Sequence, residues 1–363
     1  MTNNQISMRQ LMVILFTALL SPAVRLLPAR TAEEAGAAGW LSSLIALPVV
    51  LALCWVMSAL FRGTDAGMGL GEIAQQALSK PVGKVLTILY FVWGLLLLCA
   101  NTRLFGLRFL TTSYRNSPLA FFLVAALLLV LWLVRKPLSA FARAAEIFYL
   151  ALAVCLGLTL VFGLFQVRAE HVLPVWVEDI PDAVSAARPV LAVAGYGVFG
   201  AFLGGSVTRR PTNRRRSMKW AAVFCLVLTA LQLVCLGNFG PGLTARMDTP
   251  FFMMVKEIGV PGAFERVESV VIALWVLSDL ALLGLLAASC CSMARTVFEF
   301  KESRSAALPV VAVALVGALF FFPDTFALDQ WMAWTVEWGS LIFGFLVPAA
   351  LLVVLRLRRI RRE

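Results

Sequence analysis

Long apolar segments recur along the whole chain, and this recurrence constrains the fold more than any other feature. Hydrophobic residues make up 61% of the 363 residues and charged residues only 14%. A soluble domain has about half apolar and about a quarter charged residues, and its core could not bury so much apolar surface. Since a spanning helix needs roughly 20 apolar residues, the sequence predicts an all-α integral membrane protein with no large soluble domain.

About ten segments are apolar and long enough to be spans. The first could be a signal peptide, because Arg9 precedes it and small residues follow near Ala32. Its apolar stretch continues through Pro22 to Pro28, however, which is longer than the apolar part of a signal peptide, so we interpret it as a span. The predicted spans are 9–28, 38–61, 84–111, 118–134, 144–166, 188–207, 219–238, 267–295, 307–322 and 336–355.

The basic residues predict the orientation. With the N-terminus inside, 21 of the 31 Lys and Arg residues fall on the inner side, and the group from Arg209 to Lys219 contributes most. The positive-inside rule therefore predicts a protein of the cell membrane with both termini on the cytoplasmic side. The net charge of +11 could also suit a nucleic acid, but the basic residues gather at span ends. The lipid bilayer is the predicted partner, and no nucleic acid is.

Ten spans divide into two sets of five, and an odd number forces the second set to enter from the opposite side. The chain is thus predicted to be a single permease-like domain, 1–363, with an inverted repeat. Its first half is 9–166, its second half is 188–355, and a basic tail follows at 356–363. In such folds the first helix of each half is often broken near the midplane, where substrate binds.

Helix-breaking residues lie in corresponding positions of the two halves. Span 1 contains Ser21, Pro22 and Ala23 about halfway across, and span 6 contains several glycines among apolar residues. Proline costs about 3 kcal/mol and glycine about 1 kcal/mol in a helix interior. A broken helix and close packing of small residues both explain the glycines. The candidate ligand-binding residues of span 6 are Gly195, Tyr196, Gly197 and Gly200.

Broken helices expose backbone groups that can bind a ligand. The N–H groups at the start of a half-helix attract a carboxylate, and unwound carbonyls can accept an ammonium group. A small zwitterionic nutrient, such as an amino acid, offers both groups. We therefore expect such a ligand between the two breaks.

Ionisable residues inside spans are costly and are functional candidates. Glu268 and Asp279 lie on span 8 with Trp275 between them, and Arg103 and Arg108 lie in the outer third of span 3, at a depth that could match Glu268. Each could instead form a structural ion pair or extend to the interface. Asp279 is too deep to do so and should face a partner or a water-filled cavity. Arg103, Glu268, Trp275 and Asp279 complete the predicted ligand site.

No enzyme, metal or cofactor is predicted. The seven cysteines lie inside apolar runs without a CxxC pair, and the one histidine, His171, is in a polar loop. One histidine with no nearby cysteine does not predict a zinc site, and no GxS motif has a suitable partner histidine for a Ser-His-Asp hydrolase. The sequence also lacks the HExxH motif of zinc proteases.

Several stretches resemble the B-subunit permeases of the spore germination receptors. These are Asp248–Phe252, then Phe264–Ser269 with its aromatic-Glu-Arg-x-Glu pattern, and Ala273–Ser278 with its Trp-Val pair. Arg143–Glu146 resembles the family's entry to the fifth span, and Leu173–Val175 its loop before the sixth. Asp279 departs from the family, in which we expect an apolar residue. The sixth span also lacks the acidic residue that many relatives carry.

The resemblance implies a fold like that of the amino acid–polyamine–organocation transporters. It also implies a receptor in the spore inner membrane, built with an A subunit and a C lipoprotein subunit, which senses small nutrients and starts germination. An autonomous secondary amino acid transporter is the alternative, since it would share the fold and the broken helices. A structural subunit without a ligand is a third possibility.

Overall fold

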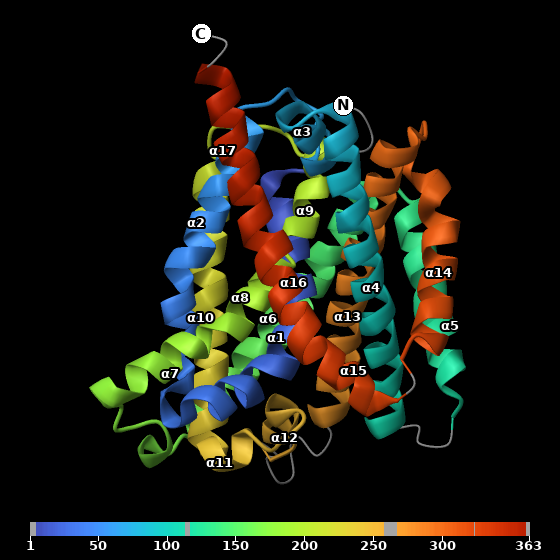
Figure 1. Ribbon diagram of the computed structural model, residues 1–363. Coiled ribbons are helices and arrows are strands. Elements are labelled where there is room, and N and C mark those ends of the chain that lie inside the picture. Colours follow the sequence, from blue (N-terminus) through green and yellow to red (C-terminus); the bar gives the residue numbers. More distant parts are fainter. Residues whose placement is uncertain (1–4, 113–116, 258–266, 323, 361–363) are drawn as a thin grey trace.

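The computed structural model describes all residues except 1–4, 113–116, 258–266, 323 and 361–363. Figure 1 shows a bundle of long helices with both chain ends at one end, here called the terminal end. The α-helices are α1 (Met8–Ala35), α2 (Ser42–Arg62), α3 (Leu70–Ala77), α4 (Lys80–Thr112), α5 (Leu119–Arg135), α6 (Leu138–Leu164), α7 (Ile180–Ser185), α8 (Ala187–Gly195), α9 (Val198–Phe202), α10 (Asn213–Phe239), α11 (Pro241–Thr244), α12 (Pro250–Glu257), α13 (Val267–Phe298), α14 (Ala307–Phe320), α15 (Thr325–Trp331), α16 (Glu337–Leu341) and α17 (Val347–Ile360).

The described helices agree with ten membrane crossings. Eight segments are long and apolar enough to cross, and the first of them, Met8–Arg62, contains both α1 and α2. A shorter apolar helix, Leu119–Arg135, adds α5. Separating α1 from α2 and counting α5 gives ten. The sixth crossing is made by α8 and α9, and the tenth by α15, α16 and α17 with two π-helical turns between them.

The first helix differs from the expected broken helix. It is helical from Met8 to Ala35 with Pro22 and Pro28 inside, and in Figure 1 its last turns run obliquely to the bundle. Proline has no N–H, so Pro22 leaves the carbonyl of Ala18 without its helical donor, and Pro28 does the same for Val24. The discontinuity therefore consists of missing hydrogen bonds rather than an unwound segment.

The sixth span is broken where the glycines predicted it. α8 ends at Gly195, Tyr196 and Gly197 form a turn, and α9 begins at Val198. Across the break the hydrogen bonds reach back three residues, from the N–H of Tyr196 to Val193 and from that of Gly197 to Ala194. This tighter winding lets the chain continue in the same direction while its α-helical ladder is interrupted.

The two interrupted elements lie at the centre of the bundle. α1 packs against α6, α8, α10 and α13, and α4 packs along α13. α5 and α14 lie at one edge, while α11 and α12 cover the end opposite the termini (Figure 1). The chain near Ile6 pairs with the segment after α9, since the N–H of Ile6 donates to Ser206 and that of Thr208 to Ile6, both at 2.9 Å. The starts of α1 and α10 are therefore connected at the terminal end.

Candidate functional site

Asp279 joins three helices in the bundle interior. Its Oδ1 accepts a hydrogen bond from Ser21 Oγ of α1, and its Oδ2 accepts one from Arg108 Nη1 of α4. Only 9% of the Asp279 side chain and 15% of the Arg108 side chain are exposed. Burying charges is costly unless they are paired and hydrogen-bonded. The deep carboxylate of α13 thus has both a cation and a hydroxyl donor, and the hydroxyl comes from the residue before Pro22.

Trp275, one turn before Asp279, covers this cluster. The Arg108 guanidinium lies 4.4 Å from the centroid of its ring, in the range of a cation–π contact. Phe251 and Phe252 of α12 pack on the other parts of the ring, with centroids 6.5 and 6.0 Å away. The indole Nε1 is buried without a hydrogen-bond partner among the described residues. An aromatic layer therefore separates the ion pair from the end opposite the termini.

A second contact holds α13 to the proline-bearing part of α1. Ser278 Oγ donates to the carbonyl of Thr17 at 2.6 Å. Thr17 Oγ1 is itself buried without a hydrogen-bond partner in the described chain. With the carbonyl of Ala18 deprived of its donor by Pro22, this stretch of α1 presents several polar groups to α13.

Arg25 and Tyr196 bring unpartnered polar atoms to the same place. Arg25 lies one helical turn beyond Ser21, on the same face of α1, and its Nη2 atom is buried without a hydrogen bond. Its charge interacts with those of Asp279, Arg108 and Asp329 and with the hydroxyl of Tyr196. That hydroxyl is also buried; it forms no hydrogen bond of good geometry with a described residue, and the Asn101 side chain lies close enough to interact with it. A buried donor left unpaired costs about 1–3 kcal/mol, so these atoms suit a ligand.

The void next to Trp275 and Ser278 is small in this conformation. A void of about 30 Å³ lies between α1, α6, α12 and α13, lined by Leu20, Val24, Leu152, Cys155, Leu156, Phe251, Trp275 and Ser278. Its volume compares with that of about one water molecule. A nutrient could enter only after helices move, and the proline-weakened α1 and broken α8–α9 are the elements best able to do so.

Sequence reasoning did not select Arg25. The available signal was its position, four residues after Ser21 on the span with the prolines. Arg108 was expected to match the depth of Glu268, but its described partner is Asp279. Glu268 is the second residue of α13, and its side chain lies outside the described residues.

Arg103 lies away from this cluster. Its Nη1 donates to the carbonyls of Ala318 and Leu319 at 2.9 and 3.2 Å. These carbonyls belong to the last turn of α14, where helical acceptors have no partner within the helix. Arg103 therefore caps α14, and the structure does not bring it together with the other predicted site residues.

The glycines of the sixth span have different surroundings. A Cβ on Gly195 would lie 2.7 Å from the carbonyl oxygen of Ser340, and Gly344 also approaches Gly195 closely, so Gly195 is a contact between α8 and the tenth span. A Cβ on Gly200 would meet Leu15 of α1 at 3.0 Å. A Cβ on Gly197 would meet only the carbonyl oxygen of Ala194, at 3.0 Å. Close packing thus accounts for Gly195 and Gly200, and the break itself for Gly197.

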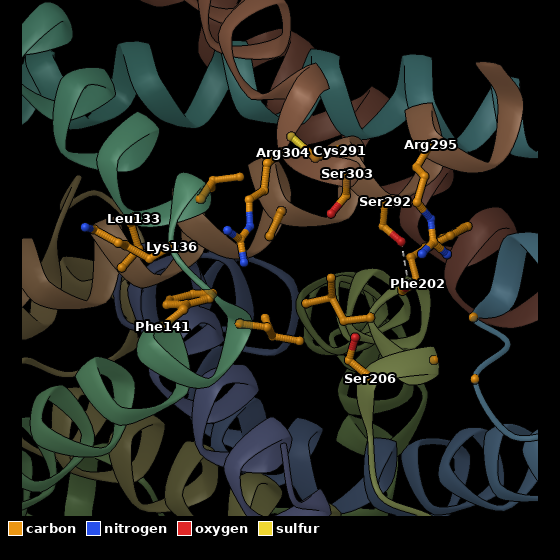
Figure 2. Close-up of a pocket in the computed structure, with 17 residues that line it drawn as sticks. Leu133, Lys136, Phe141, Phe202, Ser206, Cys291, Ser292, Arg295, Ser303 and Arg304 are labelled. Atoms are coloured by element: carbon orange, nitrogen blue, oxygen red, sulfur yellow. Dashed lines mark hydrogen bonds between the residues drawn. The ribbon is translucent and has the colours of Figure 1, made fainter. Parts of the chain in front are cut away.

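A separate polar cavity of about 130 Å³ lies at the terminal end, between α6, α13 and the segment after α9. Figure 2 shows Arg304 extending toward its centre and Ser292 hydrogen-bonded to the carbonyl of Phe202, at 2.9 Å. Beside it, Glu72 of α3 accepts hydrogen bonds from Arg295 at 2.7 Å and Thr296 at 2.9 Å. These bonds fasten α3 to α13 at this end.

Comparisons with known proteins agree with this architecture. The family model described as Spore germination protein matches residues 5–325. The chain belongs to the spore germination protein family. Among its relatives in Bacillus subtilis (strain 168), spore germination protein KB is 20% identical over 370 residues, covering 100% of this chain and 98% of the relative. Putative spore germination protein YfkT is 24% identical over 275 residues, 72% of each chain.

Solved structures show the fold of this spore germination family member. MhsT in complex with L-phenylalanine superposes with a TM-score of 0.66 at 13% identity, covering 98% of this chain and 99% of that one. A Na⁺-coupled sialic acid symporter in a substrate-bound, outward-open state gives a TM-score of 0.65 at 10% identity, covering 94% and 79%. The predicted inverted-repeat transporter fold is thereby confirmed, and family and fold are those of membrane permeases.

Proposed function

We propose that this chain is the nutrient-sensing, permease-like subunit of a spore germination receptor. A small nutrient, such as an amino acid, binds where the proline-bearing part of α1 faces Tyr196 and α13. Binding favours one of two conformations, which an A subunit and a C lipoprotein subunit detect. The subunit lies in the spore inner membrane with both termini in the cytoplasm. Family membership and a transporter fold support this role.

The unpartnered Nη2 of Arg25 beside the Tyr196 hydroxyl is the observation that carries the proposal. Both groups can donate hydrogen bonds to a carboxylate, and a charge-assisted bond to a guanidinium is among the stronger kinds. The freed carbonyl of Ala18 and the carboxylate of Asp279 can receive an ammonium group. One zwitterion would therefore satisfy the Nη2 of Arg25 and the carbonyl of Ala18, which the helix leaves without partners, and would add to the contacts that Asp279 already makes with Ser21 and Arg108.

Ligand-induced stabilisation tests this binding site directly. The purified chain is heated in detergent with each of the 20 amino acids, because a ligand at about 100 times its Kd stabilises the folded state by about 2.7 kcal/mol. Arg25→Gln should abolish the response to the active amino acids. Arg30→Gln is the matched control, because Arg30 is on the same helix but pairs with Glu33 at the surface, 3.1 Å away. Equal responses of the two variants would contradict the site.

Germination tests the receptor role. Deleting the gene in a sporulating host should remove the response to at least one nutrient, and the Arg25→Gln gene should fail to restore it. Unchanged germination to every nutrient, in a host without a paralogue, would contradict the role. Uptake of labelled amino acids by the chain alone in liposomes would instead favour an autonomous transporter.

A further inference from the structure

A large cavity lies apart from the candidate nutrient site, between α1, α2, α9 and α10. Its volume is about 720 Å³, within the range of about 300–1,000 Å³ that is typical of small-molecule sites. We call it the arginine-rimmed cavity. Its inner wall is apolar, with Leu11, Met12 and Leu15 from α1 and Val50, Leu53 and Met57 from α2. Nothing in the proposed function uses this space.

Five arginines line the terminal end of this cavity, and none of the described Asp or Glu residues lines it. They come from the end of α2 and from the segment leading into α10: Arg62, Arg209, Arg210, Arg214 and Arg215. Arg209 donates to the backbone carbonyls of Thr64 and Asp65. The other four form no ion pair with a described residue. The rim therefore has a strong net positive charge, of which Asp65 beside Arg209 offsets only part.

Two residues that line the cavity have buried polar atoms without partners. The indole Nε1 of Trp220 and the Oδ1 of Asn213 are both without a hydrogen-bond partner in the described chain, and both residues line the cavity. Buried polar groups are normally satisfied. An occupant with polar atoms just inside a charged head would meet these requirements.

We propose that the arginine-rimmed cavity binds an anionic phospholipid from the leaflet at the terminal end. The phosphate lies among the arginines, the glycerol ester region faces Trp220, and one acyl chain lies along α2. From Arg62 to Val50 the helix rises about 18 Å, and one leaflet of the hydrocarbon core is about 15 Å thick. Basic pockets between membrane helices bind the head groups of acidic lipids in the same way.

The position of this lipid gives it influence over the broken helix. Gly197 and Gly200 of the sixth span line the same cavity, and Leu15, which faces Gly200 at contact distance, does too. An acyl chain there packs against both α1 and the α8–α9 span. Lipid occupancy therefore shifts the balance between conformations of α1 and α8–α9 without touching the nutrient groups.

Native mass spectrometry of the delipidated, full-length chain tests the proposal with dioleoyl phosphatidylglycerol and dioleoyl phosphatidylcholine. The chain should retain phosphatidylglycerol preferentially. Arg214→Gln should weaken that retention about fivefold, the effect of about one arginine near a phosphate. Arg216→Gln is the matched control, because Arg216 is two residues away and exposed but does not line the cavity. Equal weakening by both variants, or equal retention of the two lipids, would overturn the proposal.

Two further arms separate head-group binding from acyl-chain binding. Cys54→Phe puts a bulky side chain into the apolar part of the cavity and should lower retention of phosphatidylglycerol. If Cys54→Phe does not fold, Met57→Phe serves the same purpose, because Met57 also lines the cavity. Glycerol phosphate at millimolar concentration should leave the bound lipid in place. Displacement by glycerol phosphate would show a soluble-anion site and overturn the assignment to a lipid.

Discussion

The two central spans are interrupted by different chemistry. In α1, Pro22 removes a hydrogen-bond donor but leaves the helix continuous, and the hydroxyl of the preceding Ser21 donates to Asp279. In α8–α9, glycines remove side chains, the helix ends and restarts, and the gain is close approach to neighbouring helices. Proline thus makes polar groups available for binding, whereas glycine makes room for packing and movement.

The comparison predicts its largest effect at Asp279, where α1 and α4 meet α13. Asp279→Leu removes the carboxylate that pairs with the buried Arg108 and should lower the free energy of unfolding by about 3–5 kcal/mol, measured by denaturant titration in detergent. The double variant Arg108→Met/Asp279→Leu removes both charges and should recover most of this loss. A double variant as unstable as the sum of the single ones would show that the pair is not coupled.

Pro22→Ala tests whether the proline serves binding at the expense of stability. Alanine restores a donor for the carbonyl of Ala18, so stability should rise by up to about 3 kcal/mol, while the amino-acid-induced thermal shift falls. Pro28→Ala is the control on the same helix, because it restores a hydrogen-bond donor for the carbonyl of Val24 instead of that of Ala18. If both variants keep the full ligand response, the proline of α1 has no role in binding.

Gly195→Ala tests the packing role of the second interruption. Its Cβ would lie 2.7 Å from the backbone oxygen of Ser340, so the tenth span must shift, at a cost of about 1–3 kcal/mol. Gly197→Ala is the matched variant two residues on, where the added Cβ meets only the carbonyl of Ala194. Comparing their thermal unfolding should show a loss for Gly195→Ala alone. Equal losses would mean that the break requires glycine at both positions.

A surface ion pair outside both interruptions should give the smallest effect. Lys84 donates to Glu299 at 2.8 Å, and Lys80 lies 3.6 Å away; these lysines lower the pKa of Glu299. The stabilisation is present above the ordinary Glu value of about 4.3 and is lost as pH falls through the lowered pKa. Glu299→Gln should therefore lower Tm slightly at pH 7 and not at all below that pKa. A difference that persists at low pH would show another role for Glu299.

The spans could be predicted because lipid exposure leaves a direct signal in the sequence. Most predicted boundaries lie within a few residues of the helices, and the glycines located the break in the sixth span. The continuity of α1 could not be predicted, because proline is compatible with both a kinked and a broken helix.

The partners of the buried charges were harder to predict, since pairing depends on how one helix is positioned against another. The depth in the membrane inferred from the sequence suggested Glu268 as the partner of Arg108, but the packing of α4 on α13 brings Arg108 to Asp279. Arg103, five residues earlier, faces the end of α14 instead. To predict the role of Arg25, one would have had to know that the face of α1 containing Ser21 turns toward Tyr196.

The structure of the chain with a bound nutrient tests the central claim most directly. Cryo-electron microscopy would use the amino acid that gives the largest thermal shift. The account predicts density between α1 and α8–α9, within hydrogen-bond distance of Arg25 and Tyr196, with Trp275 displaced from its present position. Density confined to the terminal-end cavity beside Arg304, with Arg25 and Tyr196 still unpartnered, would contradict it.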